Sequence, residues 1–322
     1  MDERNFRVAI LLATYNGERY VQQQILSLKS NITAFSLHWL DDQSTDATRE
    51  IVRAATKNAA ISVKEWHEDH HVGVPAAYFR LLEQVDSDIY LFCDQDDIWQ
   101  PGKIDATVQN LLPEMNLPVM CFSDPLLFQN SEPDKLYRLL DTVRTTAERA
   151  TQESRAFIPM VGYGHTEGFT RPLRDIYMRH SEIAKGYAYM HDMWMYTIAV
   201  AAGTARLMQG VPTTLYRRHS DNVSAGLGGW RGEGYLSVTW KQMQLVRRGI
   251  ARHARGFILA SRTLPASPKL DHLLGIARVI ATLDQRLPIP TVFRLLLRGE
   301  TYPSKRLSLQ LAFACLCSSA GA

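Results

Sequence analysis

The chain has 322 residues and the composition of an ordinary globular protein, which is enough for one large domain or two. Its net charge is only +3, but the charge is unevenly distributed. From Lys241 onward, thirteen basic residues accompany three acidic ones, so this segment carries +10 and the first 240 residues carry −7. The asymmetry indicates a separate basic segment with an anionic partner, and no apolar run approaches the ~18 residues of a membrane span.

The four cysteines, at positions 93, 121, 315 and 317, have neither the spacing of a disulfide framework nor that of a zinc site, which fits a reducing compartment. The apolar run at residues 8–13 is too short for the core of a signal peptide. We therefore expect a cytoplasmic protein, and we leave open a peripheral position on the inner face of the cell membrane.

The first hundred residues alternate apolar runs of strand length with segments of helical periodicity. The expected strands are residues 8–12, 35–40, 61–66 and 89–93, and the expected helices are residues 18–29, 47–55 and 76–84. Strands that alternate with helices at this spacing predict an α/β fold with a doubly wound, mostly parallel sheet.

Beyond residue 101 the pattern is looser. We expect strands at 119–122 and 214–219, a turn or strand edge at 162–166, a helix at 193–202, and a polar helix or loop excursion at 130–155. The glycine-rich residues 226–229 indicate a domain boundary. The sequence therefore predicts one domain over residues 1–225 and a basic helical region over 226–322, with helices at 235–260, 269–283, 290–299 and 304–317.

Two aspartate clusters follow two of the expected strands. The first contains Asp41, Asp42 and Asp46, and the second contains Asp94, Asp96 and Asp97. In open α/β sheets, ligands bind in the crevice outside the carboxyl ends of the strands. Two acidic strand ends there predict a cation and its anionic partner, such as a nucleotide diphosphate.

The second cluster is the stronger indication of a cation site. Asp94 and Asp96 supply the hard oxygens that Mg²⁺ or Mn²⁺ prefers alongside phosphates and water. The alternative is a solvated acidic turn that caps a helix starting at Pro101. The buried strand before the cluster favours the cation, because neighbouring carboxylates repel one another unless a cation or hydrogen-bond donors balance them.

The first cluster supports two interpretations equally. Asp46 has the position of a turn or helix-capping residue, which needs no ligand. Asp41 or Asp42 could instead accept the N3–H of a pyrimidine base. The residues alone do not separate these interpretations.

The segment His191-Asp192 comes directly before the expected helix at 193–202. Asp192 could act as a general base, since burial raises the pKa of a carboxyl group toward the working pH, or it could cap the helix. His219 could bind a metal ion or phosphate, or be structural. The trio His67, His70 and His71 lies in a polar run, so we expect a solvated loop there and no zinc site.

Several segments occur in an order and at a spacing that resemble a known family. They are residues 8–16 (VAILLATYN), 41–48 (DDQSTDAT), Gly73 with the helix after it, 92–103 (FCDQDDIWQPGK), 164–166 (GHT), 191–194 (HDMW) and 216–222 (YRRHSDN). Together they resemble family-2 glycosyltransferases of GT-A fold, above all the rhamnosyltransferase-like members that build bacterial surface polysaccharides. The resemblance covers about residues 6–225. Each motif alone is weak, and their order makes the resemblance specific.

The resemblance implies roles for the matching residues. The nucleotide sugar would be bound by Thr14, Tyr15, Asn16, Asp41, Asp42, Asp94 and Arg218, with Asp42 on a uracil or thymine ring. A Mg²⁺ or Mn²⁺ ion would be held by Asp94, Asp96 and His219. Asp192 would be the catalytic base for a single in-line attack that inverts the anomeric carbon. Because a cation neutralises the leaving diphosphate, two acidic clusters need not indicate a hydrolase.

Two parts of the chain depart from the family pattern or lie outside it. Residues 164–168 (GHTEG) stand where small or apolar residues are expected, and residues 130–155 are unusually polar. The basic helices after residue 225 could bind an anionic membrane surface or form a helical cap with solvated arginines. Aromatic residues are sparse after Trp240, so we do not expect nucleic acid as a partner.

The sequence as a whole therefore predicts a metal-dependent, inverting glycosyltransferase. We expect a dTDP- or UDP-sugar as the donor, with dTDP-rhamnose preferred on the resemblance, and a lipid-linked glycan acceptor in O-antigen or capsule synthesis. The alternative is a noncatalytic nucleotide-sugar or glycan-binding scaffold at the membrane surface. A phosphotransfer enzyme is disfavoured, because Gly17 lacks the rest of a Gly-x-x-x-x-Gly-Lys loop.

Overall fold

The structure is a computed structural model of the chain. It describes residues 6–130, 132–142, 146–151, 156–157, 163–219, 222 and 240–284. The expected domain boundary at 226–229 and the expected helices at 290–299 and 304–317 lie outside the described residues.

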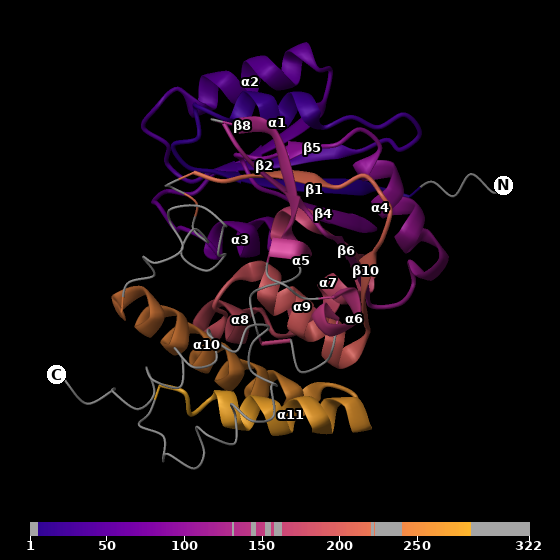
Figure 1. Cartoon of the computed structure of the whole chain (residues 1–322), viewed down its shortest axis with the longest axis vertical. Helices are drawn as coiled ribbons and strands as arrows, with labels where there is room; N and C mark the ends of the chain where they lie inside the picture. The colour runs from indigo at the N-terminus through magenta and orange to yellow at the C-terminus, as the bar shows by residue number, and fades with distance from the viewer. Residues whose placement is uncertain are drawn as a thin grey trace.

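A seven-stranded sheet forms the centre of the molecule, in the order β10-β6-β9-β4-β1-β2-β3 (Figure 1). Its strands are β1 (Val8–Thr14), β2 (Ser36–Asp41), β3 (Ser62–Trp66), β4 (Ile89–Cys93), β6 (Val119–Ser123), β9 (Glu167–Thr170) and β10 (Thr204–Met208). Every pairing is parallel except those of β9, which runs antiparallel to both β4 and β6. The predicted α/β fold with a mostly parallel sheet is confirmed.

Helices cover both faces of this sheet, and alternate residues of each strand pack against opposite layers. Ile10 and Leu91 pack in a core that includes α1 (Val21–Ser27), α2 (Thr48–Asn58) and α4 (Lys103–Leu111). Leu11 and Phe92 pack in a second core on the other face. That core includes α3 (Ala76–Gln84), α7 (Arg171–Arg179), α8 (Ser181–Tyr187) and α9 (His191–Ala202). Burial on both faces explains why these strands are continuously apolar in sequence.

A second, four-stranded sheet corrects one sequence prediction. Its order is β5 (Ile98–Trp99), β11 (Thr214–Arg217), β7 (Leu126–Gln129) and β8 (Glu132–Arg138). The expected helix or loop at 130–155 was wrong for residues 132–138, which form a strand antiparallel to β7. The described β8 side chains at 134–138 are exposed, so this edge strand has the polar sequence of a surface segment. Two short helices follow, α5 (Leu139–Thr142) and α6 (Ala147–Ala150).

The two described C-terminal helices pack on the sheet domain. They are α10 (Trp240–Ala260), which ends in the 3₁₀ turn η4 (Ser261–Thr263), and α11 (Pro268–Ile280). The buried side chains of Ile250, Phe257 and Leu273 belong to the same hydrophobic core as α8 and α9, and Figure 1 shows these helices as a layer on one side of the sheet. The expected helices at 235–260 and 269–283 are thus present, the first over its described residues from 240 and the second over 268–280. No helix in the described ranges is both long and apolar enough to cross a membrane.

Candidate active site

A cavity of about 370 Å³ opens at the carboxyl ends of β1 and β4, and we call it the central cavity. Six of the residues predicted from sequence line it, namely Thr14, Tyr15, Asp42, Asp94, Asp96 and Asp192. Of the other predicted residues, His219 does not line the cavity but contacts the lining residue Asp96. Asn16, Asp41 and Arg218 are not among the lining residues that the structure describes. The structure therefore brings most of the predicted site into one place, although the sequence spans 178 positions from Thr14 to Asp192.

Asp41 shapes the end of β2 instead of facing the cavity. Its carboxylate accepts hydrogen bonds from Thr14 Oγ1 at 2.8 Å, Ser44 Oγ at 2.6 Å and Arg49 Nε at 2.6 Å. Burial alone would raise the pKa of Asp41, but hydrogen bonds from Ser44, Arg49 and Thr14 outweigh it and lower the pKa. Asn16 plays a similar part, since its side-chain oxygen accepts the Thr45 amide at 2.8 Å and ties two loops together.

Asp42 lines one end of the central cavity and anchors the loop before α3. Its two carboxylate oxygens accept the amides of Val72 and Gly73, each at 2.7 Å. The His71 ring lies 3.0 Å from the same carboxylate and 4.3 Å from the Tyr15 ring, measured between ring centroids. Tyr15 is 44% exposed, so this end of the cavity offers an accessible aromatic surface beside a carboxylate.

The turn after β4 presents Asp94 and Asp96 to the central cavity. Asp94 accepts a hydrogen bond from the Tyr78 hydroxyl at 2.7 Å. Burial and the neighbouring charge of Asp96 raise the pKa of Asp94 to about 7. Asp96 lies 2.8 Å from His219 Nε2, and the Asn222 side chain donates to the same oxygen at 3.3 Å. Asn222 belongs to the YRRHSDN segment, but its position alone gave no reason to assign it a contact.

Asp97 points into the protein. It is fully buried, and its Oδ1 accepts the Arg217 amide at 3.0 Å. Arg217 also donates from Nε to the Asp96 carbonyl at 2.8 Å. The arginine that holds the acidic turn is thus Arg217, whereas the Arg218 guanidinium lies over the Tyr216 ring at 5.6 Å. Burial, followed by the charges of Asp96 and Asp94, raises the pKa of Asp97 well above its ordinary value.

Asp192 lies in the first turn of α9 and faces the central cavity. Helix α9 begins at His191 and its N-cap residue is Met190, so the helix-cap interpretation of Asp192 was wrong. The Asp192 carboxylate accepts the Gly164 amide at 3.0 Å and the Met193 amide at 2.6 Å. Burial raises the pKa of Asp192 to about 6 despite these hydrogen bonds. A carboxyl group with this pKa is ionised at neutral pH and basic enough to accept a proton.

The first two residues of the GHTEG segment, Gly164 and His165, line the central cavity. Residues Gly164–Thr166 make a 3₁₀ turn, η3, which leads directly into β9. His165 and Glu167 are both buried, with 1% and 0% of their surface exposed. Burial, followed by the charge of Asp192, raises the pKa of Glu167 well above its ordinary value. Polar residues here are therefore enclosed beneath the site instead of facing solvent.

Known proteins share both the sequence pattern and the fold. Residues 9–122 match the model of glycosyl transferase family 2. The chain is 26% identical over 251 residues to the dTDP-rhamnosyl transferase RfbG of Shigella flexneri, covering 73% of this chain and 79% of that protein. It is also 26% identical over 118 residues to protein RfbJ of Shigella flexneri, covering 36% and 86%. Residues 9–122 therefore carry the sequence pattern of glycosyl transferase family 2.

Solved structures place the chain among proteins of GT-A fold. S. aureus TarS 1–349, in complex with UDP-GlcNAc, superposes with a TM-score of 0.55 at 14% identity, covering 96% of this chain and 89% of that one. The mannosyltransferase PcManGT from Pyrobaculum calidifontis, in complex with GDP-Man and Mn²⁺, gives a TM-score of 0.56 at 16% identity, covering 98% and 87%. At these identities the likeness establishes the fold.

The residues at the central cavity have the chemistry of a divalent-cation site. Asp94 and Asp96 offer carboxylate oxygens, and His219 offers an imidazole nitrogen beside Asp96. Hard cations such as Mg²⁺ and Mn²⁺ prefer oxygen donors and often use one or two protein carboxylates together with substrate phosphates. The donor set therefore fits the cation that the sequence predicts.

Proposed function

We propose that this protein is a family-2 glycosyltransferase that transfers a sugar from a pyrimidine nucleotide diphosphate to a glycan acceptor, with a divalent cation and with inversion at the anomeric carbon. One observation carries the proposal. Asp192, with a pKa raised to about 6, lines the same cavity as Asp94 and Asp96. The cavity thus combines a single base with a separate pair of carboxylates suited to a cation.

Asp192 acts as the base in this mechanism. Its carboxylate takes the proton from an acceptor hydroxyl as the hydroxyl oxygen bonds to the anomeric carbon. The bond from that carbon to the diphosphate oxygen breaks in the same step, and its electron pair leaves with the nucleoside diphosphate. The hydrogen bonds from the Gly164 and Met193 amides fix the orientation of the base, and its place in the first turn of α9 favours the carboxylate form.

Asp94, Asp96 and His219 would hold Mg²⁺ or Mn²⁺ on the diphosphate. When bound, this cation supplies positive charge that stabilises the departing nucleoside diphosphate. Asn222 and Arg217 support the arrangement, because Asn222 contacts the Asp96 carboxylate and Arg217 holds the Asp96 carbonyl. Without the cation, Asp94 and Asp96 repel one another, which agrees with the raised pKa of Asp94.

The nucleotide would bind at the end of the cavity formed by Tyr15, His71 and Asp42. The paired rings of Tyr15 and His71 offer a surface on which a base can stack. Asp42 uses its oxygens to hold two loop amides, and a carboxylate has further lone pairs with which to accept the N3–H of uracil or thymine. Thr14 borders the same region.

dTDP-rhamnose is our preferred donor, and a lipid-linked oligosaccharide of O-antigen or capsule assembly is our preferred acceptor. The donor is supported by the similarity to the dTDP-rhamnosyl transferase RfbG. The acceptor is supported by the sequence resemblance to enzymes of surface polysaccharide synthesis. A lipid-linked acceptor would also suit the excess of basic residues after Lys241 and an anionic membrane surface.

The decisive experiment compares nucleotide sugars as donors for transfer to purified lipid-linked glycan, in Mn²⁺ or Mg²⁺ and in EDTA. The expected result is transfer from dTDP-rhamnose with the cation, loss of transfer in EDTA, and a product of inverted anomeric configuration by NMR. Equal transfer in EDTA would overturn the role of the cation. Transfer only from purine nucleotide sugars would overturn the pyrimidine assignment.

A further inference from the structure

A buried histidine in the wall of the central cavity has no hydrogen-bond partner for its ring among the described residues. His165 is 1% exposed, yet neither of its ring nitrogens makes a hydrogen bond within the described residues. The Oδ2 atom of the fully buried Asp97 also has no hydrogen-bond partner in that part of the chain. Buried polar groups are normally hydrogen-bonded, so buried polar atoms left without partners in one place point to a ligand site.

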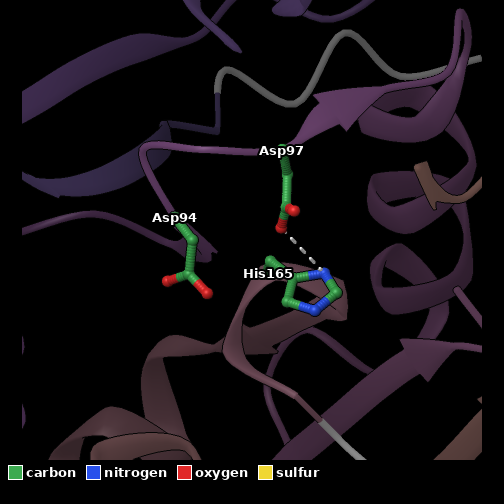
Figure 2. A group of neighbouring side chains, drawn as sticks. All are labelled: Asp94, Asp97 and His165. Carbon is green, nitrogen blue, oxygen red and sulfur yellow. Dashed lines mark ion pairs between the residues drawn. The ribbon is translucent and has the colours of Figure 1, made fainter. Parts of the chain in front are cut away.

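These atoms face one another, and Asp94 lies beside them. One ligand atom from each of Asp94, Asp97 and His165 can be chosen so that all three lie within 4.8 Å of one another. Figure 2 shows the Asp97 carboxylate pointing at the His165 ring, with Asp94 on the same turn. The Asp97 Oδ2 and His165 Nδ1 atoms are 3.4 Å apart, which is longer than an ordinary hydrogen bond.

Neighbouring groups fix the positions of two of these residues, Asp97 and His165. The Arg217 amide donates to Oδ1 of Asp97, which leaves Oδ2 facing His165. The Thr214 hydroxyl donates to the His165 carbonyl at 2.8 Å, and the His165 ring stacks on the Tyr216 ring at 4.7 Å. Asp97 and His165 are therefore positioned by neighbouring groups, as is usual for ligands of metal sites.

No cationic side chain among the described residues contacts this pair of carboxylates closely enough to replace a metal ion. The buried Lys103 ammonium lies over the Trp99 ring at 3.4 Å and makes no ion pair of 4 Å or less with Asp94 or Asp97 within the described chain. A doubly charged cation would balance both carboxylates at once. It could enter through the central cavity, which both Asp94 and His165 line.

We propose that Asp94, Asp97 and His165 form an inner site for a divalent first-row transition metal, distinct from the outer cation on the diphosphate and sharing only Asp94 with it. An imidazole nitrogen with two carboxylates selects Mn²⁺, Co²⁺ or Zn²⁺ over Mg²⁺, which prefers oxygen donors. All three protein ligands are present without nucleotide, so the inner metal binds to the free enzyme. It fixes η3 to the acidic turn, and the Gly164 amide of η3 holds the base Asp192.

The inner site is tested by counting Mn²⁺ bound to the full-length protein without nucleotide, by electron paramagnetic resonance. The expected result is one bound ion per chain. The affinity for this ion should fall by at least about tenfold in His165→Gln and in Asp97→Asn, but it should be unchanged in His219→Gln. His191→Gln is the matched control, because His191 is also buried with both ring nitrogens unpartnered in the described part of the chain, but it lies outside the ligand group. It should keep the ion.

A spectroscopic measurement separates the loss of a metal ligand from the misfolding of a variant. In His219→Gln, the bound Mn²⁺ should still show electron spin echo modulation from an imidazole nitrogen, and Co²⁺ should give a visible absorption band that excess Mg²⁺ does not remove. Absence of nucleotide-free Mn²⁺ binding, absence of nitrogen modulation, or unchanged affinity in His165→Gln would overturn the inner site. The outer cation is measured separately, as additional Mn²⁺ that binds only with dTDP or UDP, so either proposal can fail alone.

Discussion

The Gly164 amide donates a hydrogen bond to Asp192 Oδ2 at 3.0 Å, and this contact joins the turn η3 to the first turn of α9. Gly164 has room for no larger residue, since a Cβ at this position would lie 2.8 Å from Nε2 of His191. The His191 ring cannot move easily, because it stacks on Tyr78 at 3.8 Å and meets the edge of Phe92 at 4.7 Å. The orientation of the proposed base therefore depends on a glycine.

Gly164→Ala should lower kcat by about 10²-fold, because a small displacement of η3 moves the amide away from Asp192 and misorients the carboxylate. The KM for the nucleotide sugar should change little, since the donor would bind elsewhere in the cavity. The measurement is steady-state transfer kinetics. Gly186→Ala in α8 is the control, because a Cβ there meets nothing within 4 Å, and it should keep parental activity. Equal kcat in the two variants would contradict the role of Gly164.

Asp192→Asn should reduce transfer by about 10²–10⁴-fold, because the amide cannot accept the proton of the acceptor hydroxyl. Nucleotide affinity should stay close to that of the parent, since Asp192 has no part in the proposed nucleotide or cation sites. Isothermal titration with dTDP and Mn²⁺ checks the binding, and the transfer assay checks the activity. Normal turnover in this variant would remove Asp192 from the mechanism.

The pH dependence follows from the pKa of Asp192, which burial raises to about 6. The base works only when it is ionised, so kcat/KM should be low at acidic pH, rise as the pH passes through about 6, and then level off. The residual activity of Asp192→Asn should lack this rise. A profile that falls between pH 5 and 7 would have the wrong sign for a carboxylate base.

The sequence was sufficient to predict the parallel strands and the acidic turns that follow them. A strand buried on both faces is continuously apolar, and a ligand crevice lies at its carboxyl end, so Asp94 and Asp96 could be found from local pattern. Local pattern could not show that Asp97 turns inward, because its partner Arg217 is 120 positions away. Nor could it show that Gly164 positions Asp192, since that contact depends on tertiary packing.

Polarity misled the sequence prediction at residues 132–138, and at His165 and Glu167 it gave no sign of their burial. Residues 132–138 are polar because β8 is an exposed edge strand, so they lack the apolar alternation of a half-buried strand. His165 and Glu167 are polar although they are buried, which no hydropathy pattern predicts. Asp41 and Asp42 are adjacent in sequence, yet only Asp42 faces the central cavity, because successive side chains at a strand end point to opposite sides.

Asp96→Asn and His219→Gln should each weaken the Mn²⁺-dependent binding of dTDP or UDP by about tenfold or more, because each removes a proposed ligand of the cation on the diphosphate. In EDTA both variants should bind the nucleotide as weakly as the parent does. Isothermal titration in the two buffers separates the contribution of the cation from that of the base pocket. If the nucleotide affinity of the variants also differs from that of the parent in EDTA, these residues affect nucleotide binding independently of the cation.

The packing of α10 on the sheet domain can be tested with two glycines in the C-terminal helices. A Cβ at Gly256 would lie 2.3 Å from Cβ of Tyr187, at the contact between α10 and α8. Gly256→Ala should therefore force the helices apart and lower the free energy of unfolding by about 1–3 kcal/mol.

Gly275→Ala in α11 is the matched comparison, because a Cβ there meets nothing within 4 Å. It should raise the free energy of unfolding by about 0.5–1 kcal/mol, since alanine is the better helix former. Urea denaturation of the full chain measures both variants. Stabilisation by Gly256→Ala of the same size as Gly275→Ala would mean that α10 is not held against α8. Opposite signs would show that α10 is packed tightly against α8 at Gly256.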